Sequence, residues 1–187
     1  MTKIAILSSH NGSGFDTLYQ ASKNNILDID IPLIISNNTN AKVIQNAKKL
    51  NIENHIINDK LFKNVDEEIV KLLNKHNCRY IFLSGYMKKI SSLITRNFKV
   101  INSHPSLLPL YGGAGMYGRY VHEAVINNKE SISGVTIHEV DENYDEGKII
   151  LQKSLNIKDD ETANSLEERI KILEQEAIID GFKLCLK

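Results

Sequence analysis

Short apolar runs alternate with amphipathic segments through the first half of the chain. A continuous apolar run is typical of a strand buried on both faces, and residues 4–7 form such a run. Further strands are predicted at 31–35, 80–83 and 99–101, with a weaker one at 55–57. Segments with apolar residues at helical spacing lie between them, at about 15–23, 41–50, 65–76 and 91–96. This alternation predicts an α/β fold in which helices cover both faces of a mostly parallel sheet.

The pattern changes after Pro109, where residues 111–118 are rich in glycine and are predicted to be mobile. The later elements are predicted as a helix near 120–127, strands at 135–140 and 149–151, and a closing helix over 162–186. The closing helix is amphipathic, and its buried stripe consists of Leu166, Ile170, Leu173 and Ala177. Near its start, Asn164 and Glu167 have the spacing of a capping box.

Length and composition narrow the class of protein. The 187 residues favour a single domain, 1–187, because one domain per ~150 residues is the usual scale. Lys plus Arg equals Asp plus Glu at 23 each, so no excess of positive charge attracts nucleic acid. The first residues lack the pattern of a signal peptide, and no apolar run approaches the ~20 residues of a membrane span. The two cysteines are far apart in the sequence, which suggests reduced thiols. We expect a cytoplasmic protein without nucleic-acid or membrane partners.

The most informative polar residues stand where the fifth predicted strand ends. Asn102 and His104 are two residues apart, so they point to the same side of an extended backbone, and Pro105 favours that extended conformation at His104. An amide donor beside an imidazole suits a reaction at a carbonyl group. The alternative is that Asn102 is a turn residue and that His104 is structural.

A second candidate site lies after the first predicted strand, in the small-residue loop that contains Gly12, Ser13 and Gly14. Backbone N–H groups in such a loop, before a helix, can hold a phosphate. The loop is not a dinucleotide fingerprint, because Thr17 stands where the third glycine belongs, and it lacks the ending of a P-loop. A tight turn without a ligand is an equally acceptable interpretation.

An acidic loop follows the strand predicted at 135–140. A carboxylate from this loop, which contains Asp145, Glu146 and Gly147 at its last turn, could approach His104, favour the protonated imidazole and orient it. We expect Asp141 and Glu142 to be solvated charges, and His138 to be a supporting or core histidine.

These residues together resemble a known family. The motif Asn-x-His-Pro-Ser-Leu-Leu-Pro begins at Asn102 and is followed by Asp145 in an Asp-Glu-Gly turn, a combination similar to the folate-dependent formyltransferase family. The resemblance covers nearly the whole chain, including the first loop and the segment 84–87. It implies a Rossmann-like formyltransferase fold, an enzyme with 10-formyltetrahydrofolate as formyl donor, and no metal. It further implies glycinamide ribonucleotide as the acceptor, within purine biosynthesis, and leaves monomer and homodimer both open.

The resemblance also implies roles for individual residues. Asn102 would donate a hydrogen bond to the oxyanion, His104 would act as acid and base, and Asp145 would raise the pKa of His104. The residues implied in binding the ribonucleotide are Gly12, Ser13, Gly14 and Glu174. Those implied along the folate site are Lys63, Met87, Lys88, Lys89, Ile90 and Asn102.

Two departures from the family concern the acceptor more than the formyl transfer. Gly14 replaces an asparagine that is usual in the family, and the glycine-rich segment 113–118 is inserted after Pro109. We interpret that segment as a lid. The alternative functions are a sugar-nucleotide N-formyltransferase and a non-catalytic folate- or nucleotide-binding module of the same fold. Retention of all three candidate catalytic residues argues against the module, and neutral charge argues against a formyltransferase that acts on tRNA.

Overall fold

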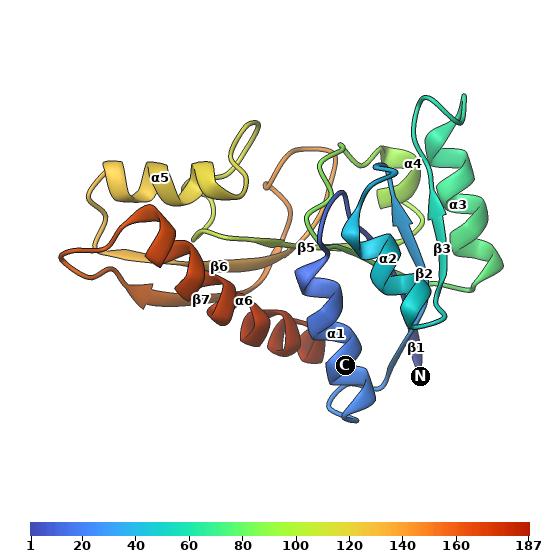
Figure 1. Cartoon of the computed structure of the whole chain (residues 1–187), viewed down its shortest axis with the longest axis horizontal. Coiled ribbons are helices and arrows are strands. Elements are labelled where there is room, and N and C mark those ends of the chain that lie inside the picture. The colour runs from blue at the N-terminus through green and yellow to red at the C-terminus, as the bar shows by residue number, and fades with distance from the viewer. The chain divides into compact units, whose positions relative to one another are not determined.

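The computed structural model describes all 187 residues, and Figure 1 shows its seven strands and six helices. In chain order they are β1 (Thr2–Leu7), α1 (Ser13–Lys23), β2 (Ile29–Ser36), α2 (Lys42–Lys49), β3 (Glu53–Ile56), α3 (Val65–Lys75), β4 (Tyr80–Leu83), α4 (Ser92–Thr95), β5 (Lys99–His104), α5 (Arg119–Asn127), β6 (Ile132–Glu139), β7 (Ile149–Asn156) and α6 (Ala163–Cys185). All the predicted helices and strands are present, with their ends shifted by a few residues. The backbone separates into two compact units, Met1–Asn102 and Ser103–Lys187, and the prediction of a single domain stays a prediction.

The first unit is a parallel sheet with helices between its strands. Its strand order is β3-β2-β1-β4-β5, and each of the four pairings is parallel. The central strand β1 is buried from Ile4 to Leu7, as the continuous apolar run predicts. Figure 1 shows α1 and α2 on one side of β1–β3 and α3 on the other. The prediction of a mostly parallel α/β sheet is therefore confirmed.

The parallel pairing of this sheet brings several loops together at the carboxyl ends of its strands. Ser9, after β1, donates its hydroxyl to Asn37 Oδ1 after β2 at 2.6 Å. The backbone N–H of Met87, after β4, donates to Ser9 Oγ at 2.8 Å, and the Ser9 N–H donates to the Gly85 carbonyl at 3.1 Å. Ser9 thus joins three loops at the edge where parallel sheets bind ligands.

The second unit contains an antiparallel pair of strands and two helices. Strands β6 and β7 pair in an antiparallel register that runs from Ile132 opposite Asn156 to His138 opposite Ile149. Helix α6 packs on both strands, and α5 packs on α6. At Gly181 of α6, an added Cβ would lie 2.9 Å from Ile137 Cγ2, so the absence of a side chain allows the helix to approach β6 closely.

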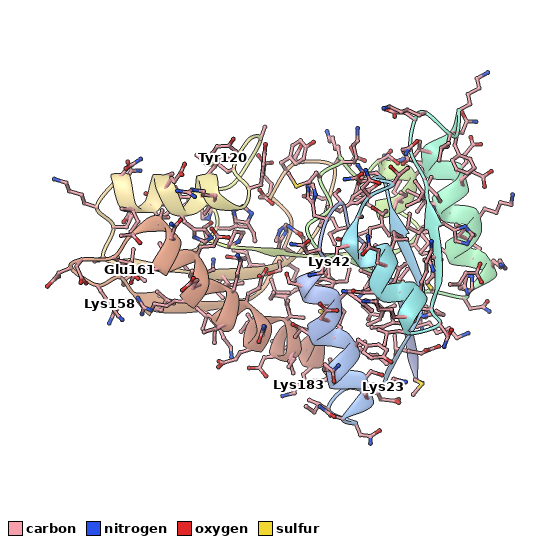
Figure 2. All side chains as sticks on the ribbon, in the orientation of Figure 1. Lys23, Lys42, Tyr120, Lys158, Glu161 and Lys183 are labelled. Atoms are coloured by element: carbon pink, nitrogen blue, oxygen red, sulfur yellow. The ribbon has the colours of Figure 1, made fainter.

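The start of α6 differs from the prediction. Its N-cap is Thr162, whose hydroxyl accepts from the Ser165 N–H at 3.2 Å while Ser165 Oγ accepts from the Thr162 N–H at 3.0 Å. The predicted capping pair of Asn164 and Glu167 is therefore wrong, because Asn164 already lies within the helix. The preceding turn is closed by Lys158 and Glu161, both labelled in Figure 2: the Glu161 N–H donates to the Lys158 carbonyl at 3.0 Å. No helix of the chain combines the length and the apolar character that a membrane span requires.

Candidate active site

Strand β5 carries both residues of the motif that the sequence singles out. It runs from Lys99 to His104, so Asn102 and His104 lie on a continuous extended segment with one residue between them. Such positions face the same side of a strand. His104 is buried, with 4% of its surface exposed, whereas Asn102 is partly exposed. The predicted arrangement of an amide and an imidazole at the end of this strand is confirmed.

His104 has a polar partner at each ring nitrogen. Its Nε2 lies 2.7 Å from the carbonyl oxygen of Tyr111, a hydrogen-bond distance, and its Nδ1 lies 3.6 Å from Asp145 Oδ2. A carbonyl oxygen only accepts hydrogen bonds, so the Nε2 atom carries a proton and its N–H donates a hydrogen bond to the Tyr111 carbonyl. In the neutral imidazole the Nδ1 atom is then unprotonated and faces the carboxylate.

Asp145 is held between two imidazoles and a backbone amide. Its Oδ2 atom accepts a hydrogen bond from the Gly113 N–H at 2.9 Å, and its Oδ1 atom lies 3.6 Å from His138 Nε2. Asp145 has a left-handed backbone with φ 58°, a conformation that aspartate tolerates better than most residues. The prediction that a carboxylate of the acidic loop reaches His104 is confirmed, whereas Asp141 and Glu142 are exposed.

The electrostatics of His104 differ in one respect from the expectation. Burial lowers the pKa of His104 from its ordinary value of 6.5, and this effect exceeds the opposing effects of the Asp145 carboxylate and the Tyr111 carbonyl. Asp145 therefore raises the pKa of His104 as expected, but the net pKa is lowered. Burial raises the pKa of Asp145, but His138, His104 and the Gly113 N–H together outweigh it, so the net pKa is lowered. The neutral imidazole beside an ionised carboxylate is the state favoured near pH 7.

The turn that follows His104 is held by one side chain of β6 and one of β7. Thr136 Oγ1 on β6 donates to the Ser106 carbonyl at 2.7 Å and accepts from the Leu108 N–H at 3.0 Å. Gln152 Nε2 on β7 donates both to Thr136 Oγ1 and to the Leu108 carbonyl, each at 2.9 Å. These bonds fix residues 106–108, and thereby the direction in which the chain leaves the catalytic strand.

Glu174 of α6 also lies in the second unit, close to the motif in space. Its carboxylate accepts a hydrogen bond from Ser103 Oγ at 2.6 Å, and Ser103 is the residue between Asn102 and His104. Burial raises the pKa of Glu174 above its ordinary 4.5, against the opposing effects of Ser103 and Lys171. The last helix thus places a carboxyl group beside the motif, while a role in substrate binding stays a prediction.

In the first unit, the small-residue loop that contains Gly12, Ser13 and Gly14 leads directly into α1. Gly12 is the N-cap residue, with a left-handed φ of 72°, and an added Cβ would lie 2.5 Å from Val43 Cγ2. Ser13 is exposed as the first helical residue, a position that suits an anion. Not every amide of this turn is available to a ligand, because the Phe15 N–H donates to Ser84 Oγ at 3.2 Å.

Gly14 has a clear physical reason to lack a side chain. A Cβ atom at this position would lie 2.7 Å from Phe82 Cε1 and 3.1 Å from Ser84 Oγ. The ring of Phe82 therefore occupies the space into which the first side-chain atom of the family's usual asparagine would project.

The segment predicted to line the folate site has mixed exposure. Met87, Lys88 and Lys89 are exposed, and Lys88 Nζ lies 4.0 Å from Asp59 Oδ2. The side chain of Ile90 is 4% exposed and belongs to the core, so any contact of Ile90 with a ligand would fall to its backbone. Lys63 is exposed in the turn before α3. These folate-site assignments stay predictions.

Within the chain, no cluster of three or more His, Cys, Asp or Glu side chains is suited to a metal ion.

Three residues of the site were not identified as functional from the sequence. Tyr111 and Gly113 act through a backbone carbonyl and a backbone N–H, for which residue type gives no signal. His138 was expected to be a supporting or core histidine; it is buried, with 1% of its surface exposed, and faces Asp145. Its position on β6 shortly before the acidic loop is the one signal that could have paired it with Asp145.

A family model described as formyl transferase matches residues 2–181 of the chain. The phosphoribosylglycinamide formyltransferase of Bacillus subtilis is 33% identical over 179 residues, which cover 93% of this chain and 89% of that protein. The chloroplastic phosphoribosylglycinamide formyltransferase of Vigna unguiculata is 35% identical over 178 residues, which cover 90% of this chain. The chain spans 55% of the length of the Vigna protein.

Solved structures show the same similarity. The crystal structure of phosphoribosylglycinamide formyltransferase from Campylobacter jejuni superposes with a TM-score of 0.86 at 30% identity, covering 100% of this chain and 98% of that chain. A glycinamide ribonucleotide transformylase from Symbiobacterium toebii superposes with a TM-score of 0.90 at 22% identity, covering 99% of this chain and 87% of that chain. The second likeness shows the fold alone, and both agree with the predicted α/β architecture.

Proposed function

Because the chain belongs to the formyl transferase family, we propose that it transfers a formyl group from 10-formyltetrahydrofolate to the amine of glycinamide ribonucleotide, a step of purine biosynthesis. The observation that carries this proposal is the site on and around β5, where Asn102 and His104 share one strand and Asp145 lies 3.6 Å from the imidazole. Binding alone needs no acid or base, so this combination favours an enzyme over a binding module.

The reaction requires one C–N bond to form and another to break. The amine nitrogen of the acceptor attacks the formyl carbon, the carbonyl oxygen becomes an oxyanion, and the bond from the formyl carbon to N10 of the folate then breaks. The attacking nitrogen loses a proton and N10 gains one. Asn102, on β5, would donate its side-chain N–H to the oxyanion, which is the charge that develops in the transition state.

His104 and Asp145 supply the proton transfer. The lowered pKa of His104 keeps the imidazole neutral near pH 7, so it can accept the proton that the amine loses, directly or through water. The resulting imidazolium is stabilised by the Asp145 carboxylate 3.6 Å from Nδ1 and can pass the proton to N10. The lowered pKa values keep His104 neutral and Asp145 ionised near pH 7, so the first can serve as base and the second as its charge partner.

The acceptor assignment rests on the relatives' names and on the first loop. Gly12, Ser13 and Gly14 form a helix start that suits a phosphate, and we propose that they bind the ribonucleotide together with Glu174. Folate would contact Lys63, the segment Met87, Lys88, Lys89 and Ile90, and Asn102. The acid/base chemistry described above requires no metal, and we propose none. We further propose a cytoplasmic protein that acts as a monomer or homodimer, without nucleic-acid or membrane partners.

The decisive experiment is a direct assay of formyl transfer. Purified protein is incubated with 10-formyltetrahydrofolate and glycinamide ribonucleotide, and folate release and formylated product are both followed. We expect equal amounts of the two products. Turnover with an amino-sugar nucleotide in place of glycinamide ribonucleotide would overturn the acceptor assignment. Tight binding of folate without turnover on either acceptor would overturn the enzyme assignment.

A further inference from the structure

A short segment after the motif contacts both members of the acid/base pair. The Tyr111 carbonyl accepts from His104 Nε2 at 2.7 Å, and two residues later the Gly113 N–H donates to Asp145 Oδ2 at 2.9 Å. Tyr111 has a left-handed φ of 57°, an uncommon conformation for a residue with a bulky side chain. Such a backbone persists when its surroundings hold it, and it occurs often at functional sites.

The phenol of Tyr111 provides that hold. Its hydroxyl donates to Glu130 Oε1 at 2.6 Å and accepts from Asn128 Nδ2 at 2.9 Å. Both partners follow α5 directly: Asn128 is the C-cap of that helix, and the Glu130 N–H donates to the Val125 carbonyl at 3.3 Å. The side chain of Tyr111 is therefore fastened to the end of a helix while its backbone carbonyl meets the catalytic imidazole.

We propose that Tyr111 is a positioning residue of the formyl transfer, which holds the His104 imidazole with its proton on Nε2 and thereby directs proton exchange to Nδ1, on the side of Asp145. This inference rests on the proposed function. It differs from a general packing role because a carbonyl acceptor at Nε2 determines the tautomer of the ring. A free histidine ring populates both tautomers, and only one of them leaves an unprotonated Nδ1 beside the carboxylate.

The arrangement also explains how the imidazolium is accommodated in a buried site. Once His104 is protonated, each ring N–H has an acceptor, because the Tyr111 carbonyl faces Nε2 and the Asp145 carboxylate faces Nδ1. The other titratable group that acts on His104 is His138, which opposes its protonation. The Tyr111 carbonyl and Asp145 therefore act together against burial and one neighbouring imidazole.

The test removes the anchor of Tyr111 while keeping its ring. In Tyr111→Phe the carbonyl loses its fixed position, so we expect the Nδ1-protonated tautomer of His104 to appear and the pKa of His104 to fall further. Both are measured without substrate, by ¹⁵N-correlated NMR of the ring nitrogens over a pH titration. In steady-state kinetics we expect kcat to fall about tenfold with KM for formyl folate nearly unchanged.

Three further variants separate positioning from folding. Glu130→Ala removes the acceptor of the phenol, and it should reproduce the Tyr111→Phe spectrum, whereas Glu130→Gln retains an acceptor and should resemble the wild type. Tyr120→Phe is the matched control, because Tyr120, labelled in Figure 2, is 56% exposed at the start of the neighbouring helix. It should leave the tautomer and kcat unchanged.

Specific results would overturn the inference. Unchanged His104 tautomer and pKa in both Tyr111→Phe and Glu130→Ala would show that the anchor does not position the ring. An equal effect of Glu130→Gln and Glu130→Ala would show that the phenol contact is irrelevant. If the proposed function itself fails, the wild type shows no formyl transfer while its NMR titration still reports the tautomer, so the two failures are distinguishable.

Discussion

At the scale of single residues, the two oxygens of Asp145 face different imidazoles, and its removal should affect both catalysis and titration. Asp145 raises the pKa of His104 against the effect of burial. Without that carboxylate, the imidazolium loses its partner at Nδ1, while the neutral ring keeps its hydrogen bond to Tyr111. Removal of Asp145 therefore destabilises the protonated His104 formed during the reaction more than the neutral His104 of the resting enzyme.

We expect Asp145→Asn and His104→Ala each to lower kcat by roughly 10²-fold or more, the scale of general acid–base catalysis. Asp145→Asn should also move the pKa of His104 further below 6.5, because a contribution that raises it is lost. Steady-state rates and an NMR titration of His104 measure the two effects. Glu142→Gln is the control, since this exposed carboxylate lies in the same loop. Wild-type rates in Asp145→Asn would exclude the proposed role.

Gly14 gives a second prediction at this scale. Restoring the family's asparagine as Gly14→Asn places a Cβ 2.7 Å from Phe82 Cε1, and overpacking of this kind costs about 1–3 kcal/mol of unfolding free energy. Phe82→Leu should relieve the clash, so the double variant should be more stable than the sum of the single effects predicts. Urea denaturation of the four proteins measures this coupling. Strict additivity would show that the ring does not exclude the asparagine.

The sequence predicted residues whose side chains carry the chemistry and missed those that act through the backbone. Asn102, His104 and Asp145 were identified because a short motif and an acidic turn mark them. Tyr111 and Gly113 were missed because any residue can present a carbonyl or an N–H. The contact between Gly14 and Phe82 was also missed, since it joins distant parts of the chain.

At the scale of elements, the strands and helices followed from apolar periodicity, but the start of α6 did not. Thr162 and Asn164 are both residues that cap helices well, and the buried stripe of α6 does not distinguish them. The observed cap is the residue whose backbone is still extended, with φ −102° and ψ 161° at Thr162. Thr162 follows a turn that the Glu161 N–H and the Lys158 carbonyl close, and the sequence pattern did not reveal this turn.

We expect Thr162→Ala to lower the free energy of unfolding by about 1 kcal/mol, because it leaves the Ser165 N–H without its acceptor. Asn164→Ala is the matched control and should change stability by less than about 0.5 kcal/mol, since it alters an exposed helical residue. Urea denaturation compares the three proteins. Equal losses in both variants, or a larger loss in Asn164→Ala, would contradict the assignment of the cap.

At the scale of the whole molecule, buried histidines should make stability depend on pH. The pKa values of His104 and His122 are both lowered by burial, below the ordinary 6.5 that the unfolded chain retains. As the pH falls through 6.5, the unfolded state binds protons that the folded state does not. The free energy of unfolding therefore decreases toward acid, until the pH reaches the lowered folded pKa values.

The expected slope is at most about 1.4 kcal/mol per pH unit for each histidine. Urea denaturation at several pH values between 7.5 and 5.5 measures it. His122→Leu should reduce the slope, because one of the two histidines no longer titrates. Glu174 acts in the opposite direction, since its raised pKa removes stability as the pH rises above 4.5, so the comparison with the variant isolates the histidine. An identical slope in both proteins would contradict the prediction.

The hydroxyl of Thr136 also makes the opening of the motif measurable by hydrogen exchange in solution. The Leu108 N–H donates to a side-chain oxygen on β6, not to a backbone carbonyl of a neighbouring strand. We expect its hydrogen to exchange with water when the turn separates from β6, because Thr136 and Gln152 hold that turn. The deuterium exchange rate of this one amide therefore measures how often the chain behind His104 opens.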